Sequence, residues 1–211
     1  MSRLTRILDL PGSYRLLGKI ACVVTNARVA YARQYLEVKA GERVLDLGCG
    51  PGDILSALPD CDYVGIDVEE RYIEAARRRF GGRGTFRCVP LEHFVLEAPE
   101  SFDLVMANGV LHHLDDLQAD AMLRLAARAM KPGGRMVTLD GCYIQGQSRI
   151  AKALLRHDRG KFIRDVPAYL KLADEHFKDV RSDVRHDLLS LPYTLLIMTC
   201  RGQRHHAGLQ V

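Results

Sequence analysis

The sequence predicts an α/β fold, a three-layer sandwich in which helices cover both faces of a mostly parallel seven-stranded sheet. Its 211 residues, 47% apolar and 27% charged, have the composition of a single globular domain. Short apolar runs alternate with helical repeats, which is typical of parallel strands joined by crossover helices. Two strand-like runs close the chain with a spacing that suits an antiparallel pair at the sheet edge.

The chain opens with two stretches that have apolar residues at helical spacing, residues 14–25 and 27–36. We expect residues 1–40 to form a helical cover outside the sheet. The alternation of strands and helices begins after this cover. Strands are predicted at 43–47, 63–67, 85–89, 102–107 and 135–139, and helices at 54–58, 69–80 and 118–130. The Lys-Pro-Gly-Gly sequence at 131–134 predicts a turn.

The pattern becomes helical and basic after the fifth strand, and we expect residues 141–178 to form a lid inserted before the last two strands, at 180–184 and 194–200. Between residues 141 and 164 the only acid is Asp158, against six cations: Arg149, Lys152, Arg156, Arg159, Lys161 and Arg164. A solvated helix face explains such a run, and so does a lid that meets an anionic acceptor. Residues 203–211 are predicted to be a disordered tail.

Charge and cysteine content set further limits on the class of protein. The net charge of +4 is modest and does not by itself indicate a nucleic-acid partner. The six cysteines lack C-x-x-C spacing, so the sequence predicts neither a disulfide framework nor a metal site. The apolar stretch at residues 20–24 is too short to cross a bilayer, and we expect a cytoplasmic protein without a membrane anchor.

The sequence VLDLGCGPG, at residues 44–52, joins a predicted strand to a helical run through a glycine-rich turn. Such turns let a ligand approach backbone N–H groups closely. The dinucleotide pattern G-x-G-x-x-G fails here, because its third glycine falls on Asp53. The pattern is instead D-x-G-x-G-x-G, formed by Asp46, Gly48, Gly50 and Gly52. Because carboxylates repel phosphate, an uncharged or cationic ligand fits this turn better than a pyrophosphate does.

Asp67 ends the next predicted strand, 21 residues after Asp46 (67 − 46 = 21). An acid at this place in similar folds accepts hydrogen bonds from ribose hydroxyls. The alternative is that Asp67 caps the helix that begins near Glu69.

Over about residues 43–139, the chain resembles the class I S-adenosylmethionine-dependent methyltransferases. Four blocks occur in that family's order: VLDLGCGPG, VGIDV, FDLVMANGVLHHL and MKPGGRMVTLD. The resemblance implies a Rossmann-like fold and S-adenosylmethionine as cofactor. It also implies that Asp46 and the three glycines hold the methionyl part of this cofactor, that Asp67 holds the ribose, and that Asn108 completes the pocket.

Adenine recognition departs from the family's pattern. Many members place an aspartate after the third strand, where this chain has Pro90. We therefore expect the backbone near Leu91, or the Glu92 side chain, to contact adenine.

Methyl transfer from a sulfonium is an in-line displacement, so the protein mainly aligns the reactants and, for a protonated acceptor, supplies a base. Three residues at the carboxyl ends of the predicted strands are candidates for contact with the reacting atoms, namely His113, Asp140 and Tyr143. His113 matches a histidine that is frequent in the family. The adjacent histidines also allow a packing or capping role for at least one of them.

The sequence therefore predicts a small-molecule methyltransferase and favours an anionic acceptor over a neutral one, and it does not indicate the oligomeric state. An RNA or protein methyltransferase is one alternative, although the fourth strand ends in Asn108-Gly-Val-Leu and not in an N-P-P-Tyr type block. A non-catalytic subunit that binds the cofactor is the other alternative. Nucleic-acid binding is not expected.

Overall fold

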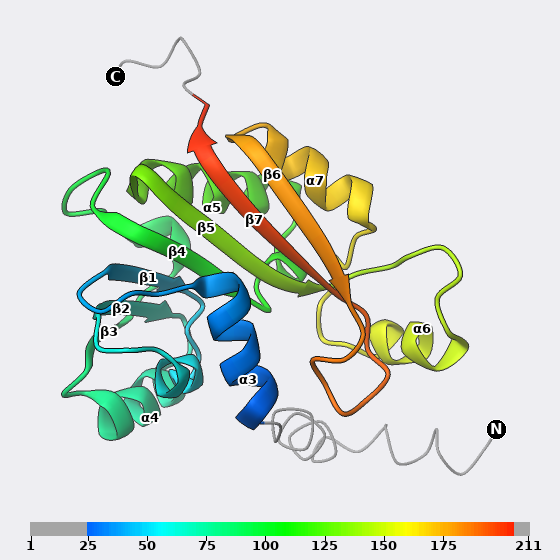
Figure 1. Ribbon diagram of the computed structural model, residues 1–211, viewed down its shortest axis with the longest axis horizontal. Helices are drawn as coiled ribbons and strands as arrows, with labels where there is room; N and C mark the ends of the chain where they lie inside the picture. The colour runs from blue at the N-terminus through cyan, green and yellow to red at the C-terminus, as the bar shows by residue number, and fades with distance from the viewer. Residues whose placement is uncertain (1–24, 205–211) are drawn as a thin grey trace.

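The computed structural model describes residues 25–204, which form one seven-stranded sheet with strand order β3-β2-β1-β4-β5-β7-β6 (Figure 1). The first five strands are parallel, while β7 pairs antiparallel with both β5 and β6. The predicted fold class, including the antiparallel edge pair, is confirmed. The predicted helix at 14–25 lies outside the described residues, apart from Thr25.

The strands are β1 (Arg43–Leu47), β2 (Asp62–Asp67), β3 (Gly84–Cys88), β4 (Phe102–Asn108), β5 (Met130–Gly141), β6 (Phe177–Arg185) and β7 (Leu195–Gln203). The α-helices are α3 (Thr25–Tyr31), α4 (Glu70–Phe80), α5 (Asp116–Ala129), α6 (Arg149–Arg156) and α7 (Val166–Asp174). Shorter helical turns lie at Ala32–Leu36, Asp53–Ala57, Leu91–His93 and Leu111–His113.

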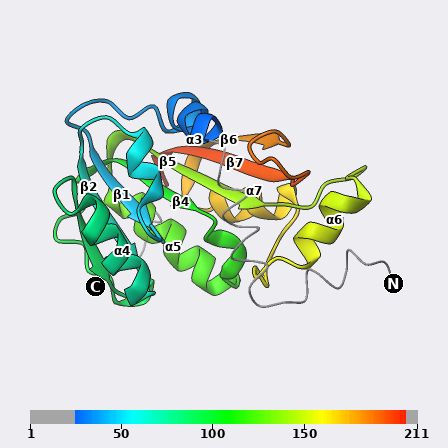
Figure 2. The same ribbon diagram turned by 90° about the horizontal axis from the view of Figure 1, so that it is seen from below.

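Side chains on the inner strands alternate between two apolar layers, which explains the sandwich. Leu45 and Leu47 of β1 face a core shared with α5 and α7, whereas Val44 faces a second core shared with α3 and α4. Figure 2 shows the helices on both sides of the sheet, with α6 extending beyond it. Among the described residues, the helices are too short or too polar to cross a membrane.

Three segments differ from the predictions in their boundaries. The predicted turn at 131–134 lies within β5, where the pairing with β4 shifts register and Gly133 has φ of +80°. The predicted helix at 27–36 divides into α3 and a π-helical turn. The predicted disordered tail at 203–211 begins too early, because Gln203 belongs to β7 and the Arg204 backbone donates to the His176 carbonyl. Residues 205–211 lie outside the described residues.

Candidate functional site

The glycine turn follows β1 and is held against the end of β2 by backbone hydrogen bonds. The N–H groups of Gly48 and Cys49 both donate to the Ile66 carbonyl, at 2.8 and 2.9 Å. Gly50 N–H donates to Asp67 Oδ2 at 2.8 Å. Because these contacts fix the turn at the carboxyl ends of two parallel strands, the turn is part of the edge where ligands bind in open α/β sheets.

The three glycines of the turn have positive φ, of +73°, +52° and +72°, but different surroundings. A Cβ at Gly48 would lie 2.6 Å from Val110, and one at Gly52 would lie 3.2 Å from Phe86. A Cβ at Gly50 would meet nothing within 4 Å. Gly48 and Gly52 are therefore needed for packing within the protein, whereas Gly50 leaves open space beside the turn.

Asp46 is buried at the end of β1, with 2% of its surface exposed. Its Oδ2 accepts a hydrogen bond of 2.6 Å from the Tyr63 hydroxyl, while its Oδ1 has no hydrogen-bond partner among residues 25–204. Burial raises the pKa of Asp46 to about 7, against the opposing effect of the Tyr63 hydrogen bond and with a further contribution from the Asp67 charge. A buried carboxylate with one free oxygen is a binding group for a cationic or hydrogen-bond-donating ligand.

Asp67 lies at the end of β2 and uses both carboxylate oxygens within the protein. Besides Gly50 N–H, it accepts a hydrogen bond of 2.9 Å from the Glu69 backbone. Asp67 therefore has part of the alternative capping role, because it accepts a hydrogen bond from the backbone just before α4 begins. Each carboxylate oxygen accepts more than one hydrogen bond, so this arrangement leaves room for ligand hydroxyls.

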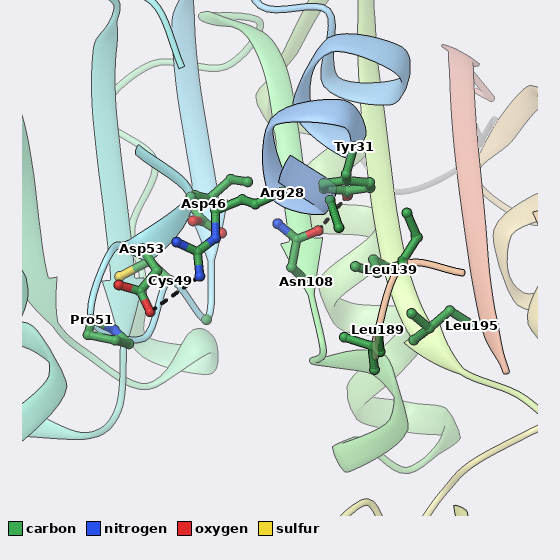
Figure 3. Close-up of a pocket in the computed structure, with 14 residues that line it drawn as sticks. Arg28, Tyr31, Asp46, Cys49, Pro51, Asp53, Asn108, Leu139, Leu189 and Leu195 are labelled. Carbon is green, nitrogen blue, oxygen red and sulfur yellow. Dashed lines mark hydrogen bonds and ion pairs between the residues drawn. The ribbon is translucent and has the colours of Figure 1, made fainter. Parts of the chain in front are cut away.

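A pocket of about 300 Å³ opens beside Asp46 and Gly48, between α3 and the carboxyl ends of β1, β4 and β5. Figure 3 shows that its side chains divide by chemistry. At one end lie Arg28, Asp46, Cys49, Pro51 and Asp53, and at the other end lie Leu139, Leu189 and Leu195. Leu188, the neighbour of Leu189 in the chain, also lines the pocket. This volume is at the lower end of the range for small-molecule pockets.

Tyr31 and Asn108 meet between the two ends of the pocket. The Tyr31 hydroxyl donates a hydrogen bond of 2.6 Å to Asn108 Oδ1. Burial raises the pKa of Tyr31 well above its ordinary value, so the phenol is uncharged at neutral pH. The sequence indicated Asn108 but not Tyr31, because nothing in the helical pattern of 27–36 distinguishes an aromatic residue above the pocket from one in the core.

The three predicted catalytic residues do not line this pocket within the described part of the chain. Asp140 is buried and accepts hydrogen bonds from the backbone and Nδ1 of His112, at 3.2 and 2.8 Å. His113 is exposed, and Tyr143 is partly buried with its backbone bonded to the Arg164 carbonyl. The catalytic roles of His113, Asp140 and Tyr143 stay a prediction. The contact that the structure shows for Asp140 is with His112, whose imidazole it positions.

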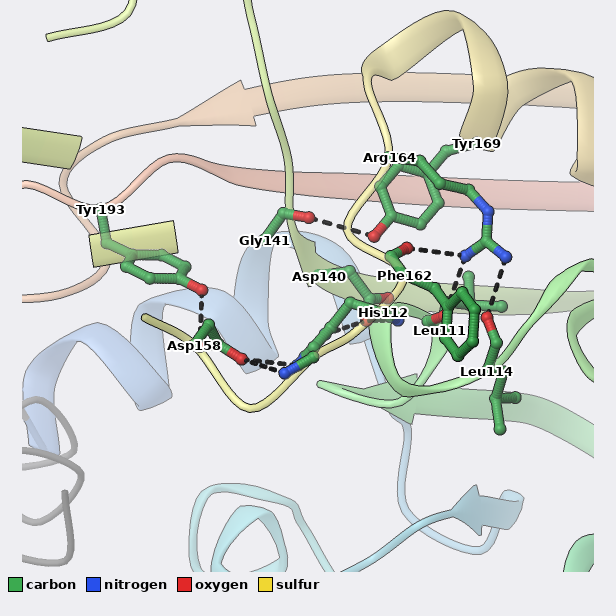
Figure 4. Close-up of polar contacts among 11 residues, drawn as sticks. Leu111, His112, Leu114, Asp140, Gly141, Asp158, Phe162, Arg164, Tyr169 and Tyr193 are labelled. Atoms are coloured by element: carbon green, nitrogen blue, oxygen red, sulfur yellow. Dashed lines mark hydrogen bonds and ion pairs between the residues drawn. The ribbon is translucent and has the colours of Figure 1, made fainter. Parts of the chain in front are cut away.

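His112 joins the end of β5 to the segment after α6 (Figure 4). Its Nε2 lies 3.5 Å from Asp158 Oδ1, and the other oxygen of Asp158 accepts a hydrogen bond of 2.8 Å from the Tyr193 hydroxyl. Burial alone would lower the pKa of His112, but the hydrogen bond and charge of Asp140 and the charge of Asp158 raise it. Of the two adjacent histidines, His112 is therefore the one that packs within the protein. Neither histidine caps α5, because its N-cap residue is Asp115.

Arg164 attaches the predicted lid to the turn after β4. Its guanidinium donates to the carbonyls of Leu111 and Leu114, at 3.0 and 2.8 Å, and to Asp116 Oδ1. Its side chain is 10% exposed and lies over the Tyr169 ring. The other basic residues of the predicted lid are on the surface, and none of the six lines the pocket. The prediction that these cations meet the acceptor therefore receives no support from their positions.

Leu91 and Glu92 begin the short helical turn after β3, next to the strand that ends in Asp67. The Val89 backbone donates to the Asp67 carbonyl at 3.0 Å, which places this turn on the same sheet edge as the glycine turn. Leu91 is partly buried and Glu92 is exposed. Neither lines the pocket beside Asp46, and adenine contact by either stays a prediction.

The sequence is similar to those of known methyltransferases. Residues 45–136 match a family model described as a methyltransferase domain. The chain is 30% identical to a ubiquinone biosynthesis O-methyltransferase of Stutzerimonas stutzeri over 74% of each protein. A second enzyme of that name, from Idiomarina loihiensis, is 29% identical over 63% of this chain and 54% of its own length. The chain thus spans about half the length of some of the curated relatives it matches.

The fold also matches solved structures. The N-methyltransferase NodS of Bradyrhizobium japonicum, in complex with S-adenosyl-L-homocysteine, superposes with a TM-score of 0.69 over 94% of this chain and 96% of its own, at 20% identity. The strand order, the glycine turn and these matches define a Rossmann-like methyltransferase domain. The chain belongs to the class I S-adenosylmethionine-dependent methyltransferases.

Proposed function

We propose that this protein transfers the methyl group of S-adenosylmethionine to a small molecule. The observation that supports this most is Asp46, a buried carboxylate in the pocket beside a glycine turn, with one oxygen that no described residue contacts through a hydrogen bond. The methionyl part of the cofactor has a sulfonium and an ammonium group, and both complement a carboxylate. The donor set therefore fits this cofactor better than it fits a dinucleotide pyrophosphate.

The residues of the site have separate tasks in this proposal. Asp46 faces the cationic end, the open side of Gly50 lets the cofactor lie against the backbone, and Asp67 receives the ribose hydroxyls. The bound cofactor supplies an activated methyl group. The protein then contributes alignment and exclusion of water, through the partly buried pair of Tyr31 and Asn108 between the two ends of the pocket. Roles for His113 and Tyr143 near the reacting atoms remain part of the proposal.

The relatives that act in ubiquinone biosynthesis support a small-molecule acceptor over RNA or protein. We place the activity in the cytoplasm, as the sequence predicts. The five cysteines in the described part of the chain are all free, which is compatible with a reducing compartment.

Calorimetry should show binding of both S-adenosylmethionine and S-adenosylhomocysteine, and Asp67→Ala should weaken it at least about tenfold. The variant loses an anionic acceptor for the ribose, worth roughly 1.5 to 3 kcal/mol, and also frees Gly50 N–H. A melting curve of the variant controls for unfolding. Heat with NAD but none with either sulfur compound would contradict the proposal, and unchanged affinity in Asp67→Ala would leave this residue only its contacts with the turn and α4.

Affinity for S-adenosylmethionine should rise as the pH increases from about 6 to 8. Burial raises the pKa of Asp46 to about 7, so the carboxyl is largely protonated below that pH and ionised above it. The ionised form attracts the cationic ligand, so acid weakens binding. Asp46→Asn should lower the affinity at pH 8 and flatten the pH profile. An equally steep profile in Asp46→Asn would assign the titration to another group.

A further inference from the structure

We infer that the acceptor is an uncharged molecule with an apolar body and a single hydrogen-bonding group, and that the leucine end of the pocket selects it. The leucine end comprises Leu139, Leu188, Leu189 and Leu195. This inference rests on the proposed function, since it concerns the end of the same pocket that lies away from Asp46 and the glycine turn. It differs from the anionic acceptor that the sequence favoured.

The side chains of the leucine end are held in place by packing against the core. Leu188 is 8% exposed and Leu195 7% exposed, and both belong to the second core. The segment that holds Leu188 and Leu189 is anchored at its start by Arg185, which donates to the Tyr35 hydroxyl at 2.6 Å. A fixed apolar wall favours an apolar ligand surface, because contact removes both surfaces from water.

The charges that face the pocket lie at its other end. Asp46 and Asp53 are both there, with one guanidinium, that of Arg28, whose Nη2 is 3.8 Å from Asp53. None of the described lining residues at the leucine end is charged. A carboxylate or phosphate on the acceptor would therefore lose its hydration against leucine side chains and gain no cation from the described residues there.

Tyr31 and Asn108 provide the polar contact at the border of the leucine end (Figure 3). The Tyr31 hydroxyl donates to Asn108 Oδ1, so its oxygen remains able to accept a hydrogen bond, and the Asn108 amide remains able to donate one. Apart from this pair, the Asn108 amide contacts only the Met106 sulfur, at 3.8 Å, among the contacts of the described residues. One hydroxyl or amine on the acceptor can bind here while its apolar body rests against the leucines.

Two probes that differ at one position test this selection. Both have a phenol ring and a three-carbon chain: 4-propylphenol ends in a methyl group, and 3-(4-hydroxyphenyl)propionate ends in a carboxylate. We expect protein saturated with S-adenosylhomocysteine to bind 4-propylphenol at least about tenfold more tightly than the propionate in calorimetry. Leu189→Arg should reverse this preference and leave the affinity for S-adenosylhomocysteine unchanged.

Leu117→Arg is the matched control, because Leu117 is 83% exposed on α5 and does not line the pocket. This variant should keep the preference of the unaltered protein. Tighter binding of the propionate, binding of neither probe, or an equal effect of the two arginine variants would overturn the inference. Failure to bind S-adenosylhomocysteine itself would instead contradict the proposed function, so the two failures can be told apart.

Discussion

Replacing Gly50 with valine is expected to leave the protein folded and to weaken S-adenosylmethionine binding at least about 100-fold. A Cβ at Gly50 meets nothing within 4 Å, so the valine side chain has space in the protein alone. That space lies beside Cys49 and Pro51, which line the pocket. Valine would therefore occupy the room that the cofactor needs against the backbone. Calorimetry measures the loss.

The positive φ of Gly50 adds a cost that has to be separated from the loss of binding. A non-glycine residue with φ near +52° is strained by about 1 to 3 kcal/mol. Gly41 offers a matched control, with φ of +81° and nothing within 4 Å of its Cβ, in the turn before β1. Gly41→Val should lose similar stability and keep its cofactor affinity. Equal loss of binding in the two variants would mean that backbone strain, and not blocked space, explains the effect.

Arg164→Ala is expected to lower the free energy of unfolding by about 3 kcal/mol or more. The guanidinium is 10% exposed and donates to two backbone carbonyls of the turn after β4, at Leu111 and Leu114. Its removal leaves these acceptors without the charged donor and detaches the segment before α7. For a protein of this size the melting temperature should fall by roughly 10 °C.

Arg156→Ala is the control for Arg164→Ala, since both remove one arginine from the predicted lid but Arg156 is exposed on α6. It should change stability by less than about 0.5 kcal/mol. Arg164→Lys keeps the charge but not the fork of donors, so it should recover only part of the loss. Equal melting temperatures for the two alanine variants would contradict the claim that Arg164 attaches this segment to the turn after β4.

The order of strands and helices could be predicted because each element has a local pattern, apolar runs for buried strands and helical spacing for the covering helices. The glycine turn was equally visible, since positive φ at Gly48, Gly50 and Gly52 favours that residue type and close neighbours leave no room for a side chain at Gly48 and Gly52. The extended β5 was not foreseen, because Lys-Pro-Gly-Gly has the composition of a turn. Its place within the strand depends on the residues on either side, since Met130 and Arg135 pair with Phe102 and Leu104 of β4.

The contacts between distant segments could not be predicted. Tyr31 and Asn108 are 77 positions apart, and a helical pattern does not show which aromatic side chain will lie above the strand ends. The leucine end could not be predicted for a similar reason, since apolar residues that line a pocket have the same sequence pattern as those of a core. His112 and His113 are adjacent in sequence, and only the fold shows that His112 is the one bonded to Asp140.

The measurement that tests the central claim most directly is incubation of the purified protein with S-adenosylmethionine labelled in its methyl group and fractionated cell extract, followed by mass analysis of the labelled product. We expect the label in an uncharged small molecule, and no transfer by Gly50→Val. Label found chiefly in RNA or protein would contradict a small-molecule acceptor. Tight cofactor binding without transfer to any fraction would contradict the proposed activity and favour a non-catalytic, cofactor-binding subunit.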